Sequence, residues 1–191
     1  MAIRIVSFAG SLRVGSFNKK LAHIAAIGAR EAGADVVELD LRDFPLPLFD
    51  EDVEREQGTP ANVKRLKEIM IPAAGLIIAC PEYNSSVTAA LKNAIDWVSR
   101  PAPGEGRLAA FNGKVGAIMS ASPGALGGLR GLVTVRSVLS SIGVLVLPDQ
   151  VAVPKAHEAF DEAGNLRDSA VHQAVKALGA KCTIVASKIN A

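Results

Sequence analysis

The sequence predicts a doubly wound α/β fold, in which five parallel strands form one sheet with helices on both faces. Short, continuous apolar runs recur along the chain, and segments with helical periodicity alternate with them. Strands that are buried on both faces lack the polar alternation of a solvated sheet. A strand-helix-strand order requires crossover connections, which are right-handed and make successive strands parallel.

The apolar runs define the predicted strands. They span residues 3–9, 35–39, 75–80, 115–119 and 144–147. Five strands fit the order 2-1-3-4-5 better than they fit a six-stranded dinucleotide-binding sheet. Ligands would then bind at the carboxyl ends of the first, third and fourth strands.

The helical segments follow the strands in order. They span residues 17–32, 60–72, 89–98, 126–142 and 171–189. In the third of these, Leu91, Ile95 and Val98 recur at helical spacing. Thr59 is the expected N-cap of the second, because Pro60 suits the first helical position.

Two segments have no periodic pattern. The acidic segment 43–58 is expected to be an extended loop, and long ordered loops often line sites or interfaces. The segment 152–167 matches no pattern with a role. Because no linker or internal repeat divides the chain, residues 1–191 are expected to form one domain.

Composition excludes several classes of partner. The chain of 191 residues has a net charge of +2 without basic clusters, so neither nucleic acid nor an anionic membrane surface is expected to bind. Cys80 and Cys182 show no metal-ligand or disulfide spacing, so no metal site is expected. With no export signal or spanning segment in view, the expected location is cytoplasmic.

The loop after the first strand has the character of a phosphate site. It lies at a helix N-terminus, where backbone N–H groups and the helix dipole favour an anion. Ser11, Ser16 and Asn18 add side-chain donors, and Arg13 adds a charge. Ser16 stands where a Walker A loop needs lysine, and no GxGxxG follows the strand. A mononucleotide phosphate is therefore the expected occupant, although simple capping by Ser16 is the alternative.

The next two strand ends carry similar loops. Residues 81–86 (PEYNSS) follow the third strand, where a proline-led turn could direct backbone amides, Tyr83 and Asn84 at a planar ligand. Residues 120–128 (SASPGALGG) follow the fourth strand, and their glycines allow a ring to approach the backbone. Three such loops at adjacent strand ends indicate a shared ligand site.

The segments GSLRVGSFN, PEYNSSVTAALKNAIDWVSR and SASPGALGG resemble the NADPH-dependent FMN reductase family of flavodoxin-like proteins, which includes chromate reductases, azoreductases and quinone reductases. The resemblance implies a flavodoxin-like fold, FMN as cofactor, NAD(P)H as co-substrate, and small-molecule electron acceptors such as quinones, chromate or other metal oxyanions, azo dyes and free flavin. It also implies a homodimer or homotetramer, formed through the helices 89–98 and 126–142. The residues expected to bind the cofactor are Ser11, Leu12, Arg13, Val14, Gly15, Ser16, Phe17, Asn18, Pro81, Glu82, Tyr83, Asn84, Ser120, Ala121 and Ser122.

The expected activity is a ping-pong hydride transfer, in which the flavin rather than a dedicated protein group carries the chemistry. Arg100 is a candidate contact for the anionic part of a substrate, and a cation serving the helix dipole is an equally good interpretation. A non-enzymatic FMN-binding electron carrier or redox sensor is the alternative function. No Ser/His/Asp constellation or cysteine phosphatase loop supports a hydrolase.

Overall fold

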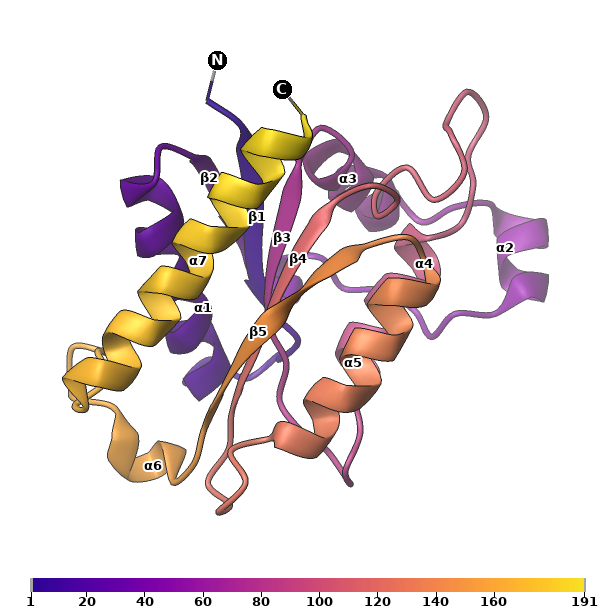
Figure 1. Ribbon diagram of the computed structural model, residues 1–191. Coiled ribbons are helices and arrows are strands. Elements are labelled where there is room, and N and C mark those ends of the chain that lie inside the picture. Colours follow the sequence, from indigo (N-terminus) through magenta and orange to yellow (C-terminus); the bar gives the residue numbers. More distant parts are fainter. Residues whose placement is uncertain (1, 191) are drawn as a thin grey trace.

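A computed structural model describes residues 2–190, and these form a parallel sheet of five strands in the order β2-β1-β3-β4-β5 (Figure 1). The strands are β1 (Arg4–Ala9), β2 (Asp35–Leu39), β3 (Gly75–Ala79), β4 (Val115–Ala121) and β5 (Leu145–Val153). Every neighbouring pair is parallel. The predicted flavodoxin-like topology is confirmed.

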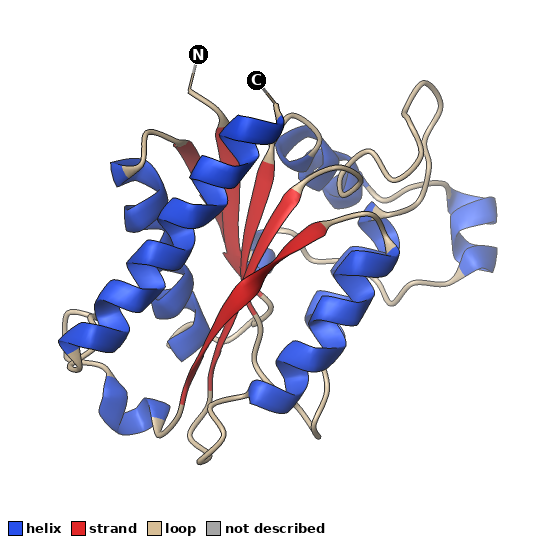
Figure 2. Ribbon diagram, viewed as in Figure 1, coloured by secondary structure: helices blue, strands red, loops and turns tan. Residues whose placement is uncertain are grey.

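Helices cover both faces of the sheet. In chain order they are α1 (Phe17–Glu31), the 3₁₀ turn η1 (Leu41–Asp43), α2 (Glu51–Gln57), α3 (Ala61–Met70), α4 (Ala89–Val98), α5 (Leu129–Ser141), α6 (Ala156–Ala159) and α7 (Ser169–Ile189). Helices α1 and α7 pack on one face, and α3, α4 and α5 pack on the other (Figure 2). Helices α1, α4 and α5 each lead back from the carboxyl edge of the sheet to the amino edge, as a right-handed crossover requires.

Two hydrophobic cores result, one on each face of the sheet. Adjacent residues of one strand serve opposite cores, because side chains alternate along a strand. Ile5 packs with α1 and α7, whereas Val6 packs with α3 and α4. Every residue of β3 and β4 is buried, which explains why both appear in the sequence as continuous apolar runs.

The fifth strand is longer than predicted and continues to Val153. Its middle carries Pro148, Asp149 and Gln150, which interrupt the apolar run. The register to β4 shifts between Gly116 and Ile118, and β5 lies at the sheet edge, where a proline and a bulge are tolerated. The predicted strand ended at residue 147 because the apolar pattern stops there, before these residues.

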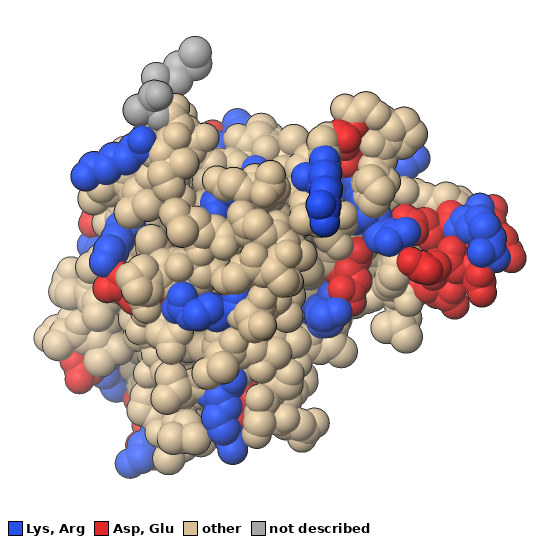
Figure 3. Space-filling view, turned by 45° about the vertical axis from the view of Figure 1, so that its right-hand side comes forward, with Lys and Arg blue, Asp and Glu red and all other residues tan. Residues whose placement is uncertain are grey.

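The prediction that 43–58 is an extended loop is wrong in part, because α2 lies within it. Asp50 caps the start of α2, accepting a hydrogen bond from the backbone N–H of Asp52 at 2.8 Å. No residue of α2 is buried, so the sequence shows no apolar periodicity there. Figure 3 shows the acidic side chains gathered on the projecting lobe that carries α2.

The predicted cap at Thr59 is also wrong. Helix α3 begins at Ala61, and Pro60 occupies the N-cap in an extended conformation (φ −55°, ψ 144°) without a side-chain cap. The chain therefore enters the helix one residue later than the proline rule suggests. Within residues 2–190, no helix combines the length and apolar character needed to cross a bilayer.

Candidate functional site

Three loops meet at the carboxyl ends of β1, β3 and β4. They enclose a hollow of about 70 Å³, which all three loops line. The lining residues are Ser11, Arg13, Ser16, Phe17, Asn18, Pro81, Glu82, Tyr83, Ala121, Ser122 and Pro123. The structure thus brings together segments that are more than 100 residues apart in the chain, at the edge where a doubly wound sheet binds ligands.

The first loop presents an array of unused donors at the N-terminus of α1. The backbone N–H groups of residues 14–18 have no acceptor within the described residues. The Ser16 hydroxyl makes no capping hydrogen bond, although the residue is buried. Arg13 is exposed and forms no ion pair with any described residue. Free N–H groups at a helix N-terminus beside a free cation are suited to a phosphate.

Asn18, which lines the hollow, also joins two elements of the site. Its side-chain amide donates to the Ala121 carbonyl at 2.8 Å and accepts from the Ala121 N–H at 3.0 Å. Both functions of the amide are therefore used to join the start of α1 to the end of β4. The backbone N–H of Asn18 and the second hydrogen of its side-chain amide remain available to a ligand.

The second loop is a tight, strained turn. Tyr83 and Ser86 exchange two backbone hydrogen bonds of 3.0 and 3.1 Å. The central residues Asn84 (φ 51°) and Ser85 (φ 63°) are both left-handed. Left-handed non-glycine residues cost on the order of 1 kcal/mol each and are concentrated at functional sites. The Tyr83 side chain, about half exposed, stands at the rim of the hollow.

The third loop leaves one polar atom without a partner. The Ser120 hydroxyl is fully buried and has no hydrogen bond to any described residue. Ser122 donates its backbone N–H to the Val153 carbonyl at 3.1 Å, which fixes the loop to the end of β5. Buried hydroxyls are normally paired, so the unpaired Ser120 hydroxyl is an unusual feature of the end of β4.

Some predicted residues do not line the hollow. They are Leu12, Val14, Gly15, Asn84 and Ser120. Leu12 faces a separate hollow beside Phe44, and the Val14 side chain is 77% exposed. Prediction missed Thr88, whose hydroxyl donates to the Gly10 carbonyl at 2.6 Å and also caps α4. A threonine directly before the apolar pattern 89–98 was the available signal.

Arg100 is not brought to the site. It follows α4, which ends at the amino edge of the sheet, opposite the three loops (Figure 1). Its guanidinium donates to Glu54 at 2.8 Å and stacks on the Phe49 ring at 5.4 Å. Arg100 therefore binds the α2 lobe to the body of the protein. The expectation of a substrate contact overlooked that a crossover helix carries its C-terminus away from the ligand edge.

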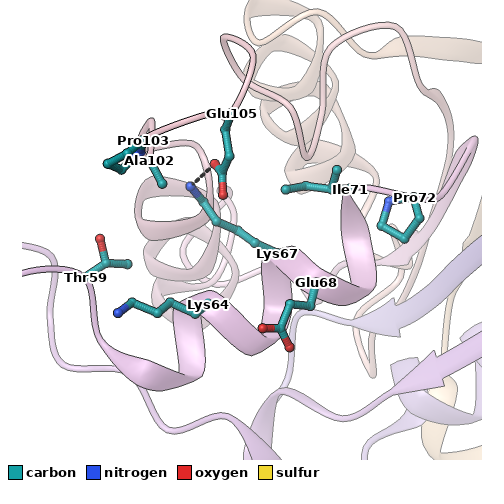
Figure 4. A pocket seen from close by; sticks show the side chains of 9 residues that line it. All are labelled: Thr59, Lys64, Lys67, Glu68, Ile71, Pro72, Ala102, Pro103 and Glu105. Carbon is teal, nitrogen blue, oxygen red and sulfur yellow. Dashed lines mark hydrogen bonds and ion pairs between the residues drawn. The ribbon is translucent and has the colours of Figure 1, made fainter.

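A larger hollow lies elsewhere in the described residues. It measures about 460 Å³ and lies between α3 and the loop 102–105 (Figure 4). The buried Lys67 ammonium is already engaged there by Glu105 at 2.6 Å and by the Arg100 carbonyl. This hollow is at the amino edge and has no array of free donors, so it is a poorer ligand site than the smaller one.

The site contains no thiolate and no metal-binding cluster. Burial raises the pKa of the Cys80 thiol to about 11, so this group next to Pro81 is protonated at neutral pH. The described residues include no group of three His, Cys, Asp or Glu side chains that could hold a metal ion. What the loops offer is a phosphate cradle and a surface of backbone and small side chains beside it.

Comparison with known proteins agrees with this geometry. A profile of the NADPH-dependent FMN reductase family matches residues 3–158. The chain is 36% identical over 175 residues to an NAD(P)H-dependent FMN reductase of Pseudomonas aeruginosa, covering 91% of this chain and 90% of that one. It is 38% identical over 148 residues to a quinone reductase of Escherichia coli, covering 76% and 73%.

Among solved structures, the flavoenzyme NAD(P)H:(acceptor) oxidoreductase FerB of Paracoccus denitrificans superimposes with a TM-score of 0.80 at 25% identity, over 98% of both chains. The matches in sequence and in fold cover all three loops of the site. The chain belongs to the NADPH-dependent FMN reductase family and is an oxidoreductase.

Proposed function

We propose that this protein binds FMN in the hollow between the three loops and uses NAD(P)H to reduce quinones. The observation that carries the proposal is the row of free backbone N–H groups at residues 14–18, next to the unpaired Arg13. A dianionic phosphate monoester would satisfy these donors, and relatives of this chain are named FMN reductase and quinone reductase.

The remaining lining fits a flavin ring. Pro81 and Tyr83 would lie along one edge of the ring, and Ala121 and Ser122 along the other. The unpartnered Ser120 hydroxyl lies at the end of β4, behind the same loop. Small side chains and open backbone allow the close approach that a flat ring requires.

Bound FMN would supply the redox chemistry, taking hydride from NAD(P)H and passing two electrons to the acceptor. The protein's part is to hold the phosphate at residues 13–18 and to fix the ring plane against the 81–86 turn. Among the lining residues only Glu82 is a carboxylic acid, and its carboxylate is occupied by Arg130 at 2.6 Å. No lining carboxylic acid, histidine or cysteine is free to act as a proton donor, so we infer that geometry and backbone dipoles provide most of the rate enhancement.

The lack of a free acidic side chain in the lining also predicts broad acceptor use. Tyr83 at the rim is half exposed. Of the two charged side chains that line the hollow, Arg13 is assigned to the phosphate and Glu82 is paired with Arg130, so neither is free to select one acceptor. We propose that quinones are the main class and that chromate or other metal oxyanions, azo dyes and free flavin are also reduced. NAD(P)H and acceptor would occupy the same open position in turn, which gives ping-pong kinetics with parallel double-reciprocal lines.

The first test is the visible spectrum of the purified protein under anaerobic conditions. We expect the two bands of oxidised flavin, bleaching on addition of NADPH, and recovery on addition of a quinone. A colourless protein that fails to take up added FMN would refute the proposal. FMN binding without NAD(P)H turnover would instead indicate an electron carrier or sensor.

A variant tests the phosphate loop directly. Removing a charge-assisted hydrogen bond costs about 1.5–3 kcal/mol, so Arg13→Ala should weaken FMN binding about 10- to 100-fold. Arg107→Ala, an exposed arginine in the loop at the opposite edge, is the matched control and should bind FMN normally. Fluorescence quenching of FMN measures both affinities.

A further inference from the structure

We propose that Glu82 is a positioning residue, which fixes the strained 83–86 turn against α5 and so prepares the site before the cofactor binds. The inference rests on the proposed function, in which that turn lies along the flavin. It goes beyond the expectation that Glu82 lines the ring, because both oxygens of the carboxylate are bound by residues of α5.

The contacts of Glu82 connect two separate elements. One carboxylate oxygen accepts hydrogen bonds from Arg130 at 2.9 and 2.6 Å. The other oxygen accepts the backbone N–H of Gly131 at 3.1 Å. Because Gly131 lies in the first turn of α5, the carboxylate also occupies the favourable end of the helix dipole. The Glu82 side chain is only 8% exposed.

Helix α5 lacks another cap that could replace this contact. Its N-cap is Gly128, which has no side chain and a left-handed backbone (φ 91°). A β-carbon on Gly128 would lie 1.9 Å from the Ser120 hydroxyl, so no capping side chain fits there. Glu82 therefore provides, from the neighbouring loop, the side-chain acceptor for the α5 N-terminus that the N-cap residue cannot provide.

The turn needs such an anchor. Asn84 and Ser85 follow Glu82 directly, and both hold left-handed backbone conformations. Strained conformations persist only where surrounding contacts determine them strongly. The two hydrogen bonds between Tyr83 and Ser86 close the turn on itself, whereas Glu82 fixes its place relative to the body of the protein.

The charge of Glu82 is well suited to this role. Burial raises the pKa of its carboxyl, but the hydrogen bonds from Gly131 and Arg130 and the charge of Arg130 outweigh burial, and the pKa is lowered overall. The carboxylate thus remains ionised throughout the neutral range, and the contact with α5 does not depend on small changes of pH.

The test compares Glu82→Met, which fills the space without an acceptor, with Glu82→Gln, which keeps an oxygen for the Gly131 N–H. Two quantities are measured: FMN affinity by fluorescence quenching, and hydrogen–deuterium exchange of the peptide 82–88 in the cofactor-free protein. Glu82→Met should weaken FMN binding at least about tenfold and speed exchange in that peptide. Glu82→Gln should recover most of both.

The matched control is Glu31→Met, which removes an ion pair to Lys176 (2.7 Å) between α1 and α7, far from the turn. It should leave both measurements unchanged. FMN affinity within twofold of the parent in Glu82→Met would overturn the proposal. A loss of affinity without faster exchange would also overturn it, because Glu82 would then act by direct contact with the cofactor. Equal impairment of the Met and Gln variants would overturn it as well.

The exchange measurement separates this inference from the proposed function. If the parent protein does not bind FMN at all, the proposed function fails. The exchange rate of 82–88 in the cofactor-free variants still reports whether Glu82 fixes the turn, and unchanged exchange would overturn the inference independently.

Discussion

Lys114 is a buried cation at the start of β4, where the chain enters the sheet. Only 5% of the residue is exposed, and its ammonium donates to the Ile71 carbonyl at 2.9 Å and to the Ala73 carbonyl. Both acceptors follow α3, so Lys114 ties the end of that helix to the amino edge of β4. Burial lowers the pKa of Lys114 to about 8 from its ordinary value of 10.5.

This shift predicts how stability depends on pH. Between pH 8 and 10.5 the unfolded chain keeps the Lys114 proton and the folded chain releases it, so the free energy of unfolding rises with pH, by at most about 1.4 kcal/mol per unit. Lys114→Met should lack this rise. Urea unfolding at pH 7.5, 8.5 and 9.5 measures the difference between the two proteins, and Lys188→Met at an exposed site is the control. Parallel pH profiles of parent and Lys114→Met would contradict the prediction.

At the scale of elements, the crossing of α1 and α7 depends on two glycines. A β-carbon on Gly28 would lie 2.0 Å from the Lys176 carbonyl oxygen, and one on Gly179 would lie 1.9 Å from the Ala25 carbonyl oxygen. Each glycine therefore lets its helix approach the backbone of the other. The pair brings the two helices close together over one face of the sheet.

Gly28→Ala distinguishes packing from helix propensity, because the two predict changes of opposite sign in the free energy of unfolding. Propensity alone would stabilise the protein by about 1 kcal/mol, whereas overpacking of a tight contact costs about 1–3 kcal/mol or more. We expect a net loss of stability, measured by urea unfolding. Gly106→Ala, where the added carbon meets no atom within 4 Å, should change stability little. A stabilised Gly28→Ala protein would show that the helices separate at low cost.

The segment leading to α2 is held by side chains of α4. The Asn93 amide accepts from the Phe49 N–H at 2.8 Å and donates to the Pro47 carbonyl at 2.9 Å, and the Trp97 indole donates to the same carbonyl at 2.8 Å. Asn93→Ala should therefore release residues 44–58 and speed their cleavage in limited proteolysis. Lys92→Ala, on the solvent side of the same helix, is the control. Equal cleavage rates would mean that the contacts of Trp97 and Arg100 hold the segment without Asn93.

These elements also show what the sequence could reveal. Strands and helices with a buried face were predictable, because burial imposes an apolar pattern, and the bounds of β2 and α4 agree residue by residue. Helix α2 buries nothing and so leaves no pattern. The double hydrogen bond of Asn18 to Ala121 joins residues 103 apart, which local spacing cannot reveal. The three strand-end loops were predictable because a parallel sheet gathers them at one edge.

For the whole molecule, the exposed apolar side chains concentrate near the site. Leu126, Leu129 and Val133 precede or lie on α5 and are 51%, 43% and 67% exposed. Tyr83, half exposed, belongs to the loop that Glu82 fixes to α5. Helix α4 has no large exposed apolar side chain, so of the two helices expected to form an interface only α5 offers such a surface. Exposed apolar patches of this kind favour association between copies.

We therefore expect a homodimer, or a tetramer of two such pairs, with α5 at a two-fold interface. Sedimentation at micromolar concentration should give at least about 40 kDa, twice the 19.8 kDa of one chain. A charge placed in the interface is costly to desolvate, so Val133→Asp should shift the mass toward that of one chain. Ile184→Asp on α7, 48% exposed and on the opposite face, is the control. A parent protein that sediments at about 20 kDa would refute association. Dissociation by Ile184→Asp alone would place the interface on α7 instead of α5.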